Sequence, residues 1–469
     1  MPDTENYEVL VVGSGEAGKY IAWTMGKAGH RTAMIERKLI GGSCPNIACL
    51  PSKNVIHSAK VVSFARRGTE FGLDFDSLRI DMAGVQLRKR NMVQDMIKIH
   101  LDRYKTSGVE LIMGTARFIA PRTVEVSLNA GGTRLIEGNR IFLDLGTRAA
   151  IPDVPGLAAS QPMTHVEALD LDHLPDHLIV LGAGYVGLEL AQAMRRFGAR
   201  VTVIERGAQL ASQEDADVGR ALLELFQDEG IEVLLKTTVQ SVEGRSGQHI
   251  VVKVEAENRL RTLEGSDILV ATGRLPNTGG IGLEQAGIKL SAQGFVEVNE
   301  RLETTSPNVW AMGDCAGSPF FTHVAFDDFR IVLDNLNGGN RTTRDRLVPF
   351  CLFTDPELGR IGLNESEAKA KGIDYRTVEI PMASVLRMRT LSELRGFIKL
   401  LVAVETDYIL GLTIFGFEAS EILAVVQTAM LAGLPYTTLR DAMFTHPTPA
   451  EGLNVLLANV PPKQASKAA

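Results

Sequence analysis

Two stretches of the chain repeat one order of hydrophobic and polar residues. In the first, the apolar run 8–12 stops at glycine, the segment 19–28 has helical spacing, and the run 31–36 ends in an acid. In the second, the run 178–181 stops at glycine, a helical segment extends to residue 197, and the run 200–205 ends in an acid. Short apolar runs that stop at glycine are typical of buried strands. The pattern therefore predicts two strand–helix–strand units.

Each unit carries three glycines between its first strand and its helix. They are Gly13, Gly15 and Gly18 in the first unit, and Gly182, Gly184 and Gly187 in the second. The acids Glu36 and Glu205 each lie 18 residues after the third glycine. Glycines let the backbone approach a pyrophosphate at the helix N-terminus, and the acid binds a ribose. The units predict two bound dinucleotides, with the alternative that the second unit has lost its ligand.

The acid of the second unit also bears on the choice of nicotinamide cofactor. Glu205 would repel a 2′-phosphate, so the second unit is expected to prefer NADH over NADPH. The adjacent Arg206 opposes that preference, because it could pair with the phosphate.

The remaining pattern predicts a long surface helix over 81–104 and a β-meander over 109–126 and 134–143. Further strands are expected within 231–256, and the stretches 267–274 and 309–314 are each expected to be a strand that ends in a glycine turn. From about residue 347 the chain reads as an α+β domain, with a strand pair at 396–403 and 409–415 and a helix over 419–432. The predicted fold class is α/β, with two Rossmann-like dinucleotide-binding domains and a C-terminal α+β domain.

Composition narrows the class of protein. The 469 residues are 45% hydrophobic and carry a net charge of −7, which is unlike the basic footprint of a nucleic-acid binder. No apolar run is long enough to span a bilayer, and residues 1–8 are acidic and polar, unlike a signal peptide. A cytoplasmic protein without a nucleic-acid or membrane partner is expected, and no metal site is predicted.

Cys44 and Cys49 are the first candidates for chemistry. Residues five apart in a regular helix lie too far apart for a disulfide, so a bridge needs a distorted turn, for which Pro45 and Pro51 are suitable. So short a loop would stabilise the fold by only about 2 kcal/mol. The pair is therefore interpreted as redox-active rather than structural. Of the other cysteines, Cys315 and Cys351 are expected to be inert buried thiols.

With these motifs in order, the sequence resembles the flavin-dependent pyridine nucleotide–disulfide oxidoreductases, the group of dihydrolipoamide dehydrogenase, glutathione reductase and mercuric reductase. The resemblance covers almost the whole chain and includes the stretch 41–53, the turns 271–274 and 312–314, and the terminal 446–451. It implies FAD on the first unit, NAD(P)H on the second and an obligate homodimer. The implied domains are FAD-binding over 1–150, NAD(P)-binding over 151–272, a central FAD-binding part over 273–346 and dimerisation over 347–469.

The resemblance also implies a role for individual residues. Cys49 would lie next to the flavin as a thiolate, Cys44 would attack the substrate, and Lys53 would pair with Glu189 near the flavin N5. His446, supported by Glu451, would be the acid–base and would come from the other subunit. Cofactor contacts are also implied for Gly13, Gly15, Ala17, Gly18, Glu36, Arg37, Gly42, Ser43, Ala116, Gly146, Thr147, Gly182, Gly184, Tyr185, Val186, Gly187, Glu205, Arg206, Val239, Gly273, Arg274, Gly313, Asp314, Phe320, Phe321, Thr322 and His323.

The resemblance leaves the electron acceptor open. The first hypothesis is electron transfer between NAD(P)H and a disulfide or dithiol, most like dihydrolipoamide dehydrogenase. The alternatives are reduction of a mercuric ion, a quinone or a reactive sulfur oxidant, and a flavoprotein subunit or redox sensor of a larger assembly. The chain departs from the family pattern at Ala48, at Pro45 and at 143–147, where Asp144 stands in a strand end that usually reads alanine-threonine-glycine-serine.

Overall fold

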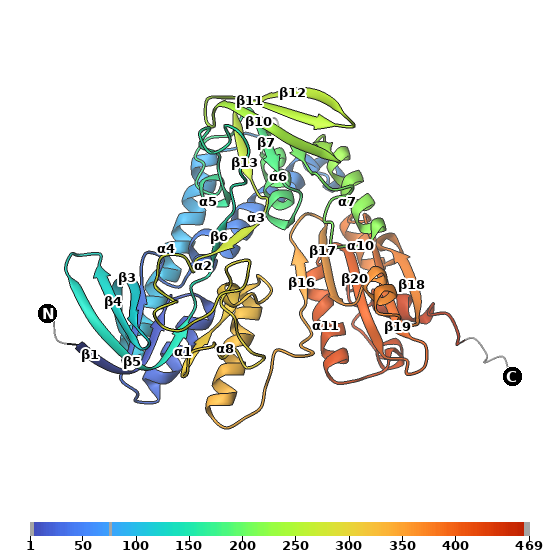
Figure 1. Cartoon of the computed structure of the whole chain (residues 1–469). Helices are drawn as coiled ribbons and strands as arrows, with labels where there is room; N and C mark the ends of the chain where they lie inside the picture. The colour runs from blue at the N-terminus through green and yellow to red at the C-terminus, as the bar shows by residue number, and fades with distance from the viewer. Residues whose placement is uncertain (1–3, 75–76, 464–469) are drawn as a thin grey trace.

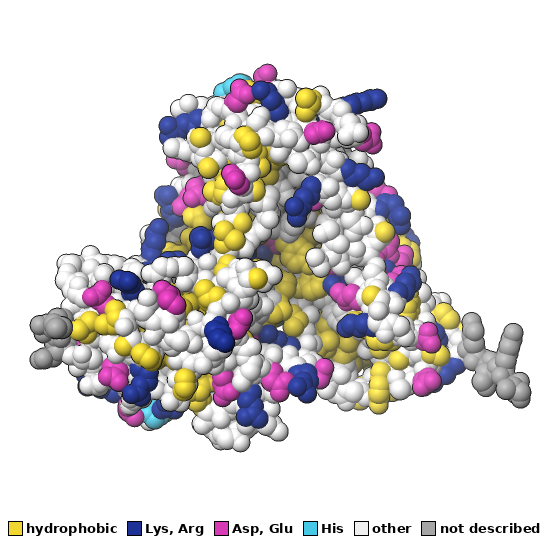
Figure 2. Space-filling view, viewed as in Figure 1, with side chains coloured by type: hydrophobic (Ala, Val, Ile, Leu, Met, Phe, Trp, Pro, Cys, Tyr) yellow, Lys and Arg dark blue, Asp and Glu magenta, His cyan; other side chains and the backbone are white. Residues whose placement is uncertain are grey.

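The structure is a computed structural model that describes residues 4–74 and 77–463. Its sheets form three groups, which lie at the left, the top and the right of Figure 1. The first group contains the N-terminal strands, the second contains strands from the middle of the chain, and the third contains the C-terminal strands. Hydrophobic side chains gather in the recess between these groups on the face shown in Figure 2.

The first sheet is built around a parallel core that begins with β1 (Thr4–Val12), which pairs with β2 (Thr32–Glu36) and β5 (Thr133–Leu143). The strands β3 (Glu110–Ala120) and β4 (Thr123–Leu128) run antiparallel and join β2 to β5 as the predicted meander. The strand β15 (Val309–Ala311) returns from far along the sequence to pair with β5. β1 begins four residues before the predicted strand, because its pairing with β5 extends to Thr4.

Helices cover this first sheet and lead to the cysteine stretch. The helix α1 (Glu16–Lys27) follows the first glycine motif, and α8 (Thr322–Leu336) packs beside it. The short helices α2 (Ser43–Ile47) and η1 (Gly68–Phe71) flank α3 (Cys49–Arg66), and α4 (Met82–Ser107) is the long surface helix that the sequence predicts. The turn η2 (Gly313–Ala316) connects β15 to α8.

The second sheet has the parallel order β13-β7-β8-β9. Its strands are β7 (His177–Leu181), β8 (Arg200–Ile204), β9 (Glu232–Leu234) and β13 (Asp267–Val270), with the helices α5 (His165–Ala168), α6 (Tyr185–Phe197) and α7 (Ala216–Asp228). An antiparallel sheet of β10 (Thr237–Arg245), β11 (His249–Ala256) and β12 (Arg259–Gly265) lies at the top of Figure 1. A short pair, β6 (Thr147–Ala149) with β14 (Arg274–Pro276), lies where the chain passes between the first and second sheets.

The C-terminal sheet has five antiparallel strands in the order β16-β17-β20-β19-β18. They are β16 (Phe350–Leu352), β17 (Glu357–Gly362), β18 (Tyr375–Pro381), β19 (Phe397–Ala403) and β20 (Ile409–Gly416). The apolar helix α11 (Ala419–Leu431) packs on β17 and β20, as its buried residues require. The other helices are α9 (Glu365–Ala370), η3 (Met382–Ser384), α10 (Leu386–Leu391), α12 (Tyr436–Arg440) and α13 (Gly452–Ala458).

The sheets confirm the predicted fold class of two Rossmann-like units followed by an α+β domain. Each unit places its glycine motif at the carboxyl end of a parallel strand, where dinucleotides bind in such sheets. Within 4–74 and 77–463, no helix combines the length and the apolar character needed to cross a bilayer. The last part of the implied dimerisation range, residues 464–469, lies outside the described residues.

Candidate active site

A helix break separates Cys44 from Cys49. Cys44 lies in α2, Cys49 is the first residue of α3, and between them Ala48 adopts φ −132° and ψ −104°. The distortion falls on Ala48, whereas Pro45 and Pro51 lie in the first turns of α2 and α3. That differs from the expectation that the prolines distort the turn, and the reason is that a first helical turn needs no N–H donor and therefore accommodates proline.

The two thiols are free and differ sharply in acidity. A hydrogen bond from Cys44 lowers the pKa of Cys49 to about 6, against the effect of burial, and the same contact together with burial raises the pKa of Cys44 far above its usual range. The hydroxyl of Thr322 lies 3.2 Å from the Cys49 sulfur and also favours its thiolate. Thr322 is the first residue of α8, so the positive end of that helix dipole faces the sulfur.

A second charged pair lies beside these thiols. Lys53 Nζ donates to Glu189 Oε2 at 2.7 Å, so the contact implied by the resemblance is present. Glu189 is buried, and its other oxygen accepts the backbone N–H of Phe353 at 2.9 Å. Lys53 also lies 4.7 Å from the ring centre of Phe353 and lowers the pKa of Cys49 through its charge. The pair therefore holds a cation near the thiolate while remaining nearly neutral overall.

Aromatic rings from three segments form a wall near the thiols. Phe321 stacks on His323 with ring centres 5.2 Å apart and on Phe350 at 6.1 Å. Tyr185, the first residue of α6, stacks on Phe350 at 5.6 Å. Phe320 is 43% exposed and lies against Phe295 instead. Three of the four residues 320–323 thus reach the thiols or this wall.

His446 and Glu451 lie together but away from the thiols of their own chain. The imidazole Nδ1 lies 2.9 Å from Glu451 Oε2, and the histidine side chain is 62% exposed. His446 lies in the loop that precedes α13, as its following proline predicts. Among the described residues, the groups that shift the pKa of Cys44 or Cys49 do not include His446. One chain therefore presents a histidine–carboxylate pair at its surface, and this pair does not contact the cysteines of the same chain.

The first glycine motif is tightly closed around its acid. Glu36 Oε2 accepts the backbone N–H and the hydroxyl of Ser14 at 2.9 and 2.7 Å. A Cβ added to Gly42 would lie 2.5 Å from the Cα of Gly15, so these two loops touch through backbone alone. The N-cap of α1, Gly15, has no side chain to occupy the helix N-terminus. This arrangement leaves a cradle of backbone N–H groups of the kind that binds a pyrophosphate.

The second glycine motif repeats the geometry. Glu205 Oε2 accepts the backbone N–H of Ala183 at 2.9 Å, and Oε1 accepts that of Gly207 at 2.7 Å. The N-cap of α6, Gly184, again lacks a capping side chain. Arg206 is exposed at the same strand end. Both motifs thus have the backbone geometry and the acid that fit a dinucleotide.

Three predicted cofactor contacts lie in one cluster at the strand ends of β6, β14 and β15. Thr147 donates to Asp314 Oδ2 at 2.5 Å and receives Arg274 Nε at 2.6 Å. Arg274 also lies 3.8 Å from Asp314. Burial raises the pKa of Asp314 despite these contacts. The cluster therefore joins three strand ends that are far apart in the sequence.

The other predicted residues lie on the same loops or farther away. Most of them belong to the glycine turns or the adjoining helix starts: Ala17, Ser43, Gly146, Val186, Gly187, Gly273 and Gly313. Ala116 is buried on β3, Arg37 is exposed after β2, and Val239 lies at a bulge of β10. Cys315 is buried with its pKa raised to about 12. Cys351 is only partly exposed rather than fully buried, which corrects that part of the expectation, but burial of its thiol raises its pKa as well.

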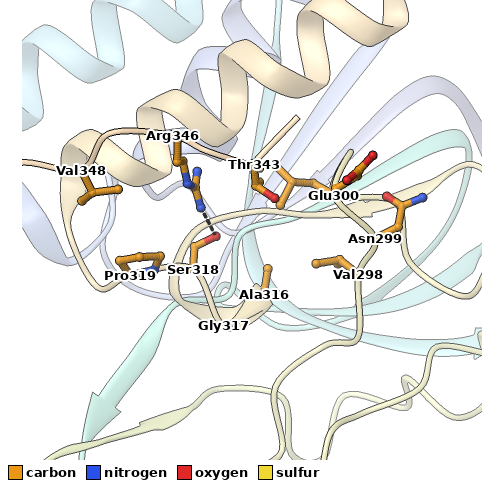
Figure 3. Close-up of a pocket in the computed structure, with 11 residues that line it drawn as sticks. Val298, Asn299, Glu300, Ala316, Gly317, Ser318, Pro319, Thr343, Arg346 and Val348 are labelled. Atoms are coloured by element: carbon orange, nitrogen blue, oxygen red, sulfur yellow. Dashed lines mark hydrogen bonds between the residues drawn. The ribbon is translucent and has the colours of Figure 1, made fainter. Parts of the chain in front are cut away.

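A cavity of about 510 Å³ lies apart from the cysteines, among loops around η2 and before β16 (Figure 3). Arg346 and Ser318 point toward each other across it, 3.3 Å apart. Arg346 also pairs with Asp328 at 2.6 Å, which in turn accepts the N–H of Gly313. The cavity wall is therefore connected to the turn that carries Asp314.

Two models of one known protein family match this chain. A family model described as pyridine nucleotide-disulphide oxidoreductase matches residues 7–328, and the dimerisation domain of that family matches 348–456. The chain belongs to this family. It is therefore an oxidoreductase of the flavoprotein NAD(P)H:disulfide type, and the dimerisation domain supports a homodimer.

The family member RclA of Escherichia coli, described as a probable pyridine nucleotide-disulfide oxidoreductase, is 34% identical over 97% of this chain and 99% of its own length. A mercuric reductase of Staphylococcus aureus is 32% identical, covering 96% of this chain and 82% of that protein. A dihydrolipoyl dehydrogenase of Geobacillus stearothermophilus is 30% identical, covering 95% and 94%. A solved structure, the Cu(II) complex of the HOCl-induced flavoprotein disulfide reductase RclA, superposes with a TM-score of 0.88 at 33% identity, covering 97% of this chain and 99% of that one. The family is thus confirmed, while dihydrolipoamide dehydrogenase is one relative among several.

Sequence reasoning missed several partners in this site. The N–H of Phe353 on Glu189 and the stack of Phe350 on Tyr185 join residues more than 160 positions apart, and no local pattern signals them. Thr322 was expected at the flavin, and its hydroxyl contact with Cys49 was not foreseen. Its place before an apolar, helically spaced segment is the one sequence signal for a helix start there.

Proposed function

We propose that the chain passes electrons from NAD(P)H through FAD to the Cys44–Cys49 pair and from there to an external acceptor. FAD, when bound, supplies hydride acceptance from nicotinamide and two-electron reduction of a disulfide. The observation that carries the proposal is the unequal pair of thiols, in which Cys44, Thr322 and Lys53 favour the thiolate of Cys49. A thiolate at neutral pH is the reactive form in thiol–disulfide exchange.

Each residue of the site has its own role in the reduction of a disulfide. Cys44, half-buried on α2, forms the bond to the acceptor, and Cys49 then attacks Cys44 Sγ to re-form the disulfide and release the reduced product. Lys53 keeps a positive charge beside the Cys49 sulfur. His446, oriented by Glu451, donates a proton to the leaving sulfur from the second subunit. One NAD(P)H thereby reduces one disulfide to two thiols.

A second acceptor class is a thiophilic metal ion. The relatives include mercuric reductases, and RclA has been solved as a Cu(II) complex. Two thiols in contact suit a soft or borderline metal ion. Within the described ranges of one chain there is no group of three metal-ligating side chains, so such an ion would be held by the thiols as a substrate rather than as a resident cofactor. One NAD(P)H would then reduce two Cu(II) ions to Cu(I).

The purified holoprotein separates these acceptors in a panel of lipoamide, glutathione disulfide, Cu(II), mercuric ion and quinones, each assayed with NADH and NADPH. We expect turnover with a disulfide or a metal ion that is lost in C44S and in C49S. Turnover that persists in both variants would contradict electron transfer through the thiols. A protein that carries no flavin would contradict the proposal altogether.

We further propose that NADH is preferred. The Glu205 carboxylate is anchored by two backbone N–H groups at the strand end where the ribose is expected, and a 2′-phosphate would meet its charge. Replacing Glu205 with serine should lower the NADH-to-NADPH ratio of kcat/KM by about tenfold, which corresponds to ~1.4 kcal/mol. The matched control E224S, at an exposed position on α7, should leave the ratio unchanged. An unchanged ratio in E205S would show that Glu205 does not set the preference.

A further inference from the structure

Asp144 occupies an unusual place beneath the first glycine motif. It follows β5 directly and is 7% exposed. Its Oδ2 accepts the backbone N–H of Gly18, in the first turn of α1, at 2.7 Å. A Cβ added to Gly15 would lie 2.6 Å from the same oxygen, and one added to Gly313 would lie 3.1 Å from Oδ1. The carboxyl group is therefore enclosed between two glycine turns that are expected to hold FAD.

The charge of Asp144 has no counter-ion. Within the described part of the chain, no Lys, Arg or His side chain forms an ion pair with it. Lys19, on the same helix, pairs with Glu16 at 2.7 Å instead. The neighbouring acids differ in this respect, because Asp328 lies 2.6 Å from Arg346 and Asp314 lies 3.8 Å from Arg274. Titratable side chains facing this carboxyl are Glu16, Lys19, Tyr104, Asp314 and Cys315.

Burial raises the pKa of Asp144 to about 7, and the charges of Asp314 and Glu16 add to this effect, while the N–H of Gly18 and the charge of Lys19 oppose it. In the protein without cofactor, this carboxyl thus keeps its proton to a much higher pH than an exposed aspartate does. The pyrophosphate of a bound FAD adds negative charge at the N-terminus of α1, the same helix end that Asp144 contacts. Two anions at one helix end, without a cation between them, repel each other.

We propose that Asp144 takes up a proton from solvent when FAD binds and remains a neutral carboxylic acid in the holoprotein. The neutral carboxyl group still accepts the hydrogen bond from the Gly18 N–H, and it does not repel the negatively charged pyrophosphate. The proposal rests on FAD occupying the first glycine motif. Asp144 acts here as a positioning residue for the cofactor and takes no part in electron transfer.

Proton linkage makes the proposal measurable. If binding takes up one proton, the dissociation constant of FAD rises by up to tenfold per pH unit above the apoprotein's pKa. Reconstitution of apoprotein with FAD between pH 6 and 9, followed by flavin fluorescence, should show this rise above pH about 7. The isosteric variant Asp144→Asn keeps an oxygen for Gly18 and has no proton to gain. Its dissociation constant should vary by less than about threefold over the same range.

A matched control and a direct readout complete the test. The variant E16Q removes an acid from the same helix turn that is already paired with Lys19, and it should keep the pH slope. Mixing wild-type apoprotein with FAD at pH 8 in weak buffer with an indicator dye should show uptake of nearly one proton per FAD. This last measurement needs no variant, so it stands even if D144N folds poorly.

The possible outcomes separate two claims. An affinity for FAD that is flat from pH 6 to 9 in the wild type, or a slope that persists in D144N, would overturn the role of Asp144. Failure of the wild-type apoprotein to bind FAD at any pH would instead overturn the cofactor assignment on which the proposal rests.

Discussion

The pKa of the Cys49 thiol is set by neighbours from four parts of the chain. Cys44 lies five residues away, Lys53 one helical turn along, Glu189 on α6 and Thr322 on α8. Cys44, Thr322 and Lys53 lower this pKa, whereas burial and the charge of Glu189 raise it. The balance leaves a thiolate at neutral pH, and the pair can then act asymmetrically.

The contribution of Thr322 can be measured at this scale. In the reduced holoprotein, the long-wavelength thiolate–flavin absorbance should disappear as the pH falls through about 6, because protonation removes the Cys49 thiolate. Thr322→Val removes the hydroxyl that stabilises this thiolate and should raise the midpoint by about one pH unit, since a hydrogen bond to a charged group contributes ~1.5 kcal/mol or more. Absorbance titration gives both midpoints.

Two variants control this titration. T428V changes an exposed threonine on α11 that bonds only within its own helix, and it should leave the midpoint in place. C49S should show no such band at any pH. A midpoint that stays put in T322V would mean that the hydroxyl of Thr322 does not stabilise the thiolate.

Among the secondary-structure elements, a buried lysine ties the C-terminal sheet to the second dinucleotide-binding unit. Lys399, on β19, is 2% exposed and lies 3.0 Å from Asp215 and 2.5 Å from Asp217, at the start of α7. It also lies 3.2 Å from Glu365, at the start of α9. Acids near helix N-termini are favourable, and here one cation contacts three of them. This contact joins β19, α7 and α9 at the boundary between two units.

Removing that cation should destabilise the protein. Lys399→Met leaves the buried Asp215 and its two acidic neighbours without their shared cation and should lower the free energy of unfolding by about 3 kcal/mol, measured by urea denaturation at neutral pH. K371M, at an exposed position just after α9, should change it by less than about 0.5 kcal/mol. Equal stabilities of K399M and K371M would contradict the role of Lys399.

The same cluster predicts the sign of an acid effect. Burial opposes the ionisation of Asp215, but hydrogen bonds from Ser366 and Lys399 overcome it and hold its pKa at about 2. The folded pKa lies below the unfolded value of about 3.9, so the stability from Asp215 is present above pH about 4 and is lost as the pH falls toward 2.

For the molecule as a whole, the proposed site needs the thiols of one subunit and the surface pair His446–Glu451 of the other. The histidine is 62% exposed in one chain, and the matched dimerisation domain spans residues 348–456, which include it. Dimers of this kind are symmetric, so each subunit can give its histidine to the other and receive one in return. The three domain boundaries, after residues 150, 272 and 346, remain predictions.

Subunit mixing tests the exchange of histidines. C49S and H446A should each be nearly inactive as pure homodimers. After unfolding and refolding a 1:1 mixture, half of the dimers are mixed, and each mixed dimer has one intact site, so about a quarter of wild-type activity should return. Were the histidine to serve the thiols of its own chain, no mixed dimer would hold an intact site and no activity would return. As the control, each variant is unfolded and refolded by itself, and the two samples are then combined.

Much of this architecture was readable from the chain itself. The alternation of apolar runs and helical spacing predicted both strand–helix–strand units, the meander and the strand pair of the C-terminal domain, because these signals are local in sequence. The glycine spacing and the acids Glu36 and Glu205 predicted where the dinucleotides bind, because a tight turn and a helix start need those residues together. Element ends were less well predicted, as at β1, since pairing with a distant strand extended it.

The tertiary structure alone decided the chemistry of the site. The neighbours of the Cys49 sulfur come from α2, α3, α6 and α8, and a pKa depends on distance and burial rather than on position in sequence. The enclosure of Asp144 between two glycine turns likewise needs the strand end of β5 and the helix start of α1 to meet, 126 residues apart. Local pattern determined which elements form, whereas packing determined which charges face one another, because electrostatic and hydrogen-bonding partners are set by proximity in space.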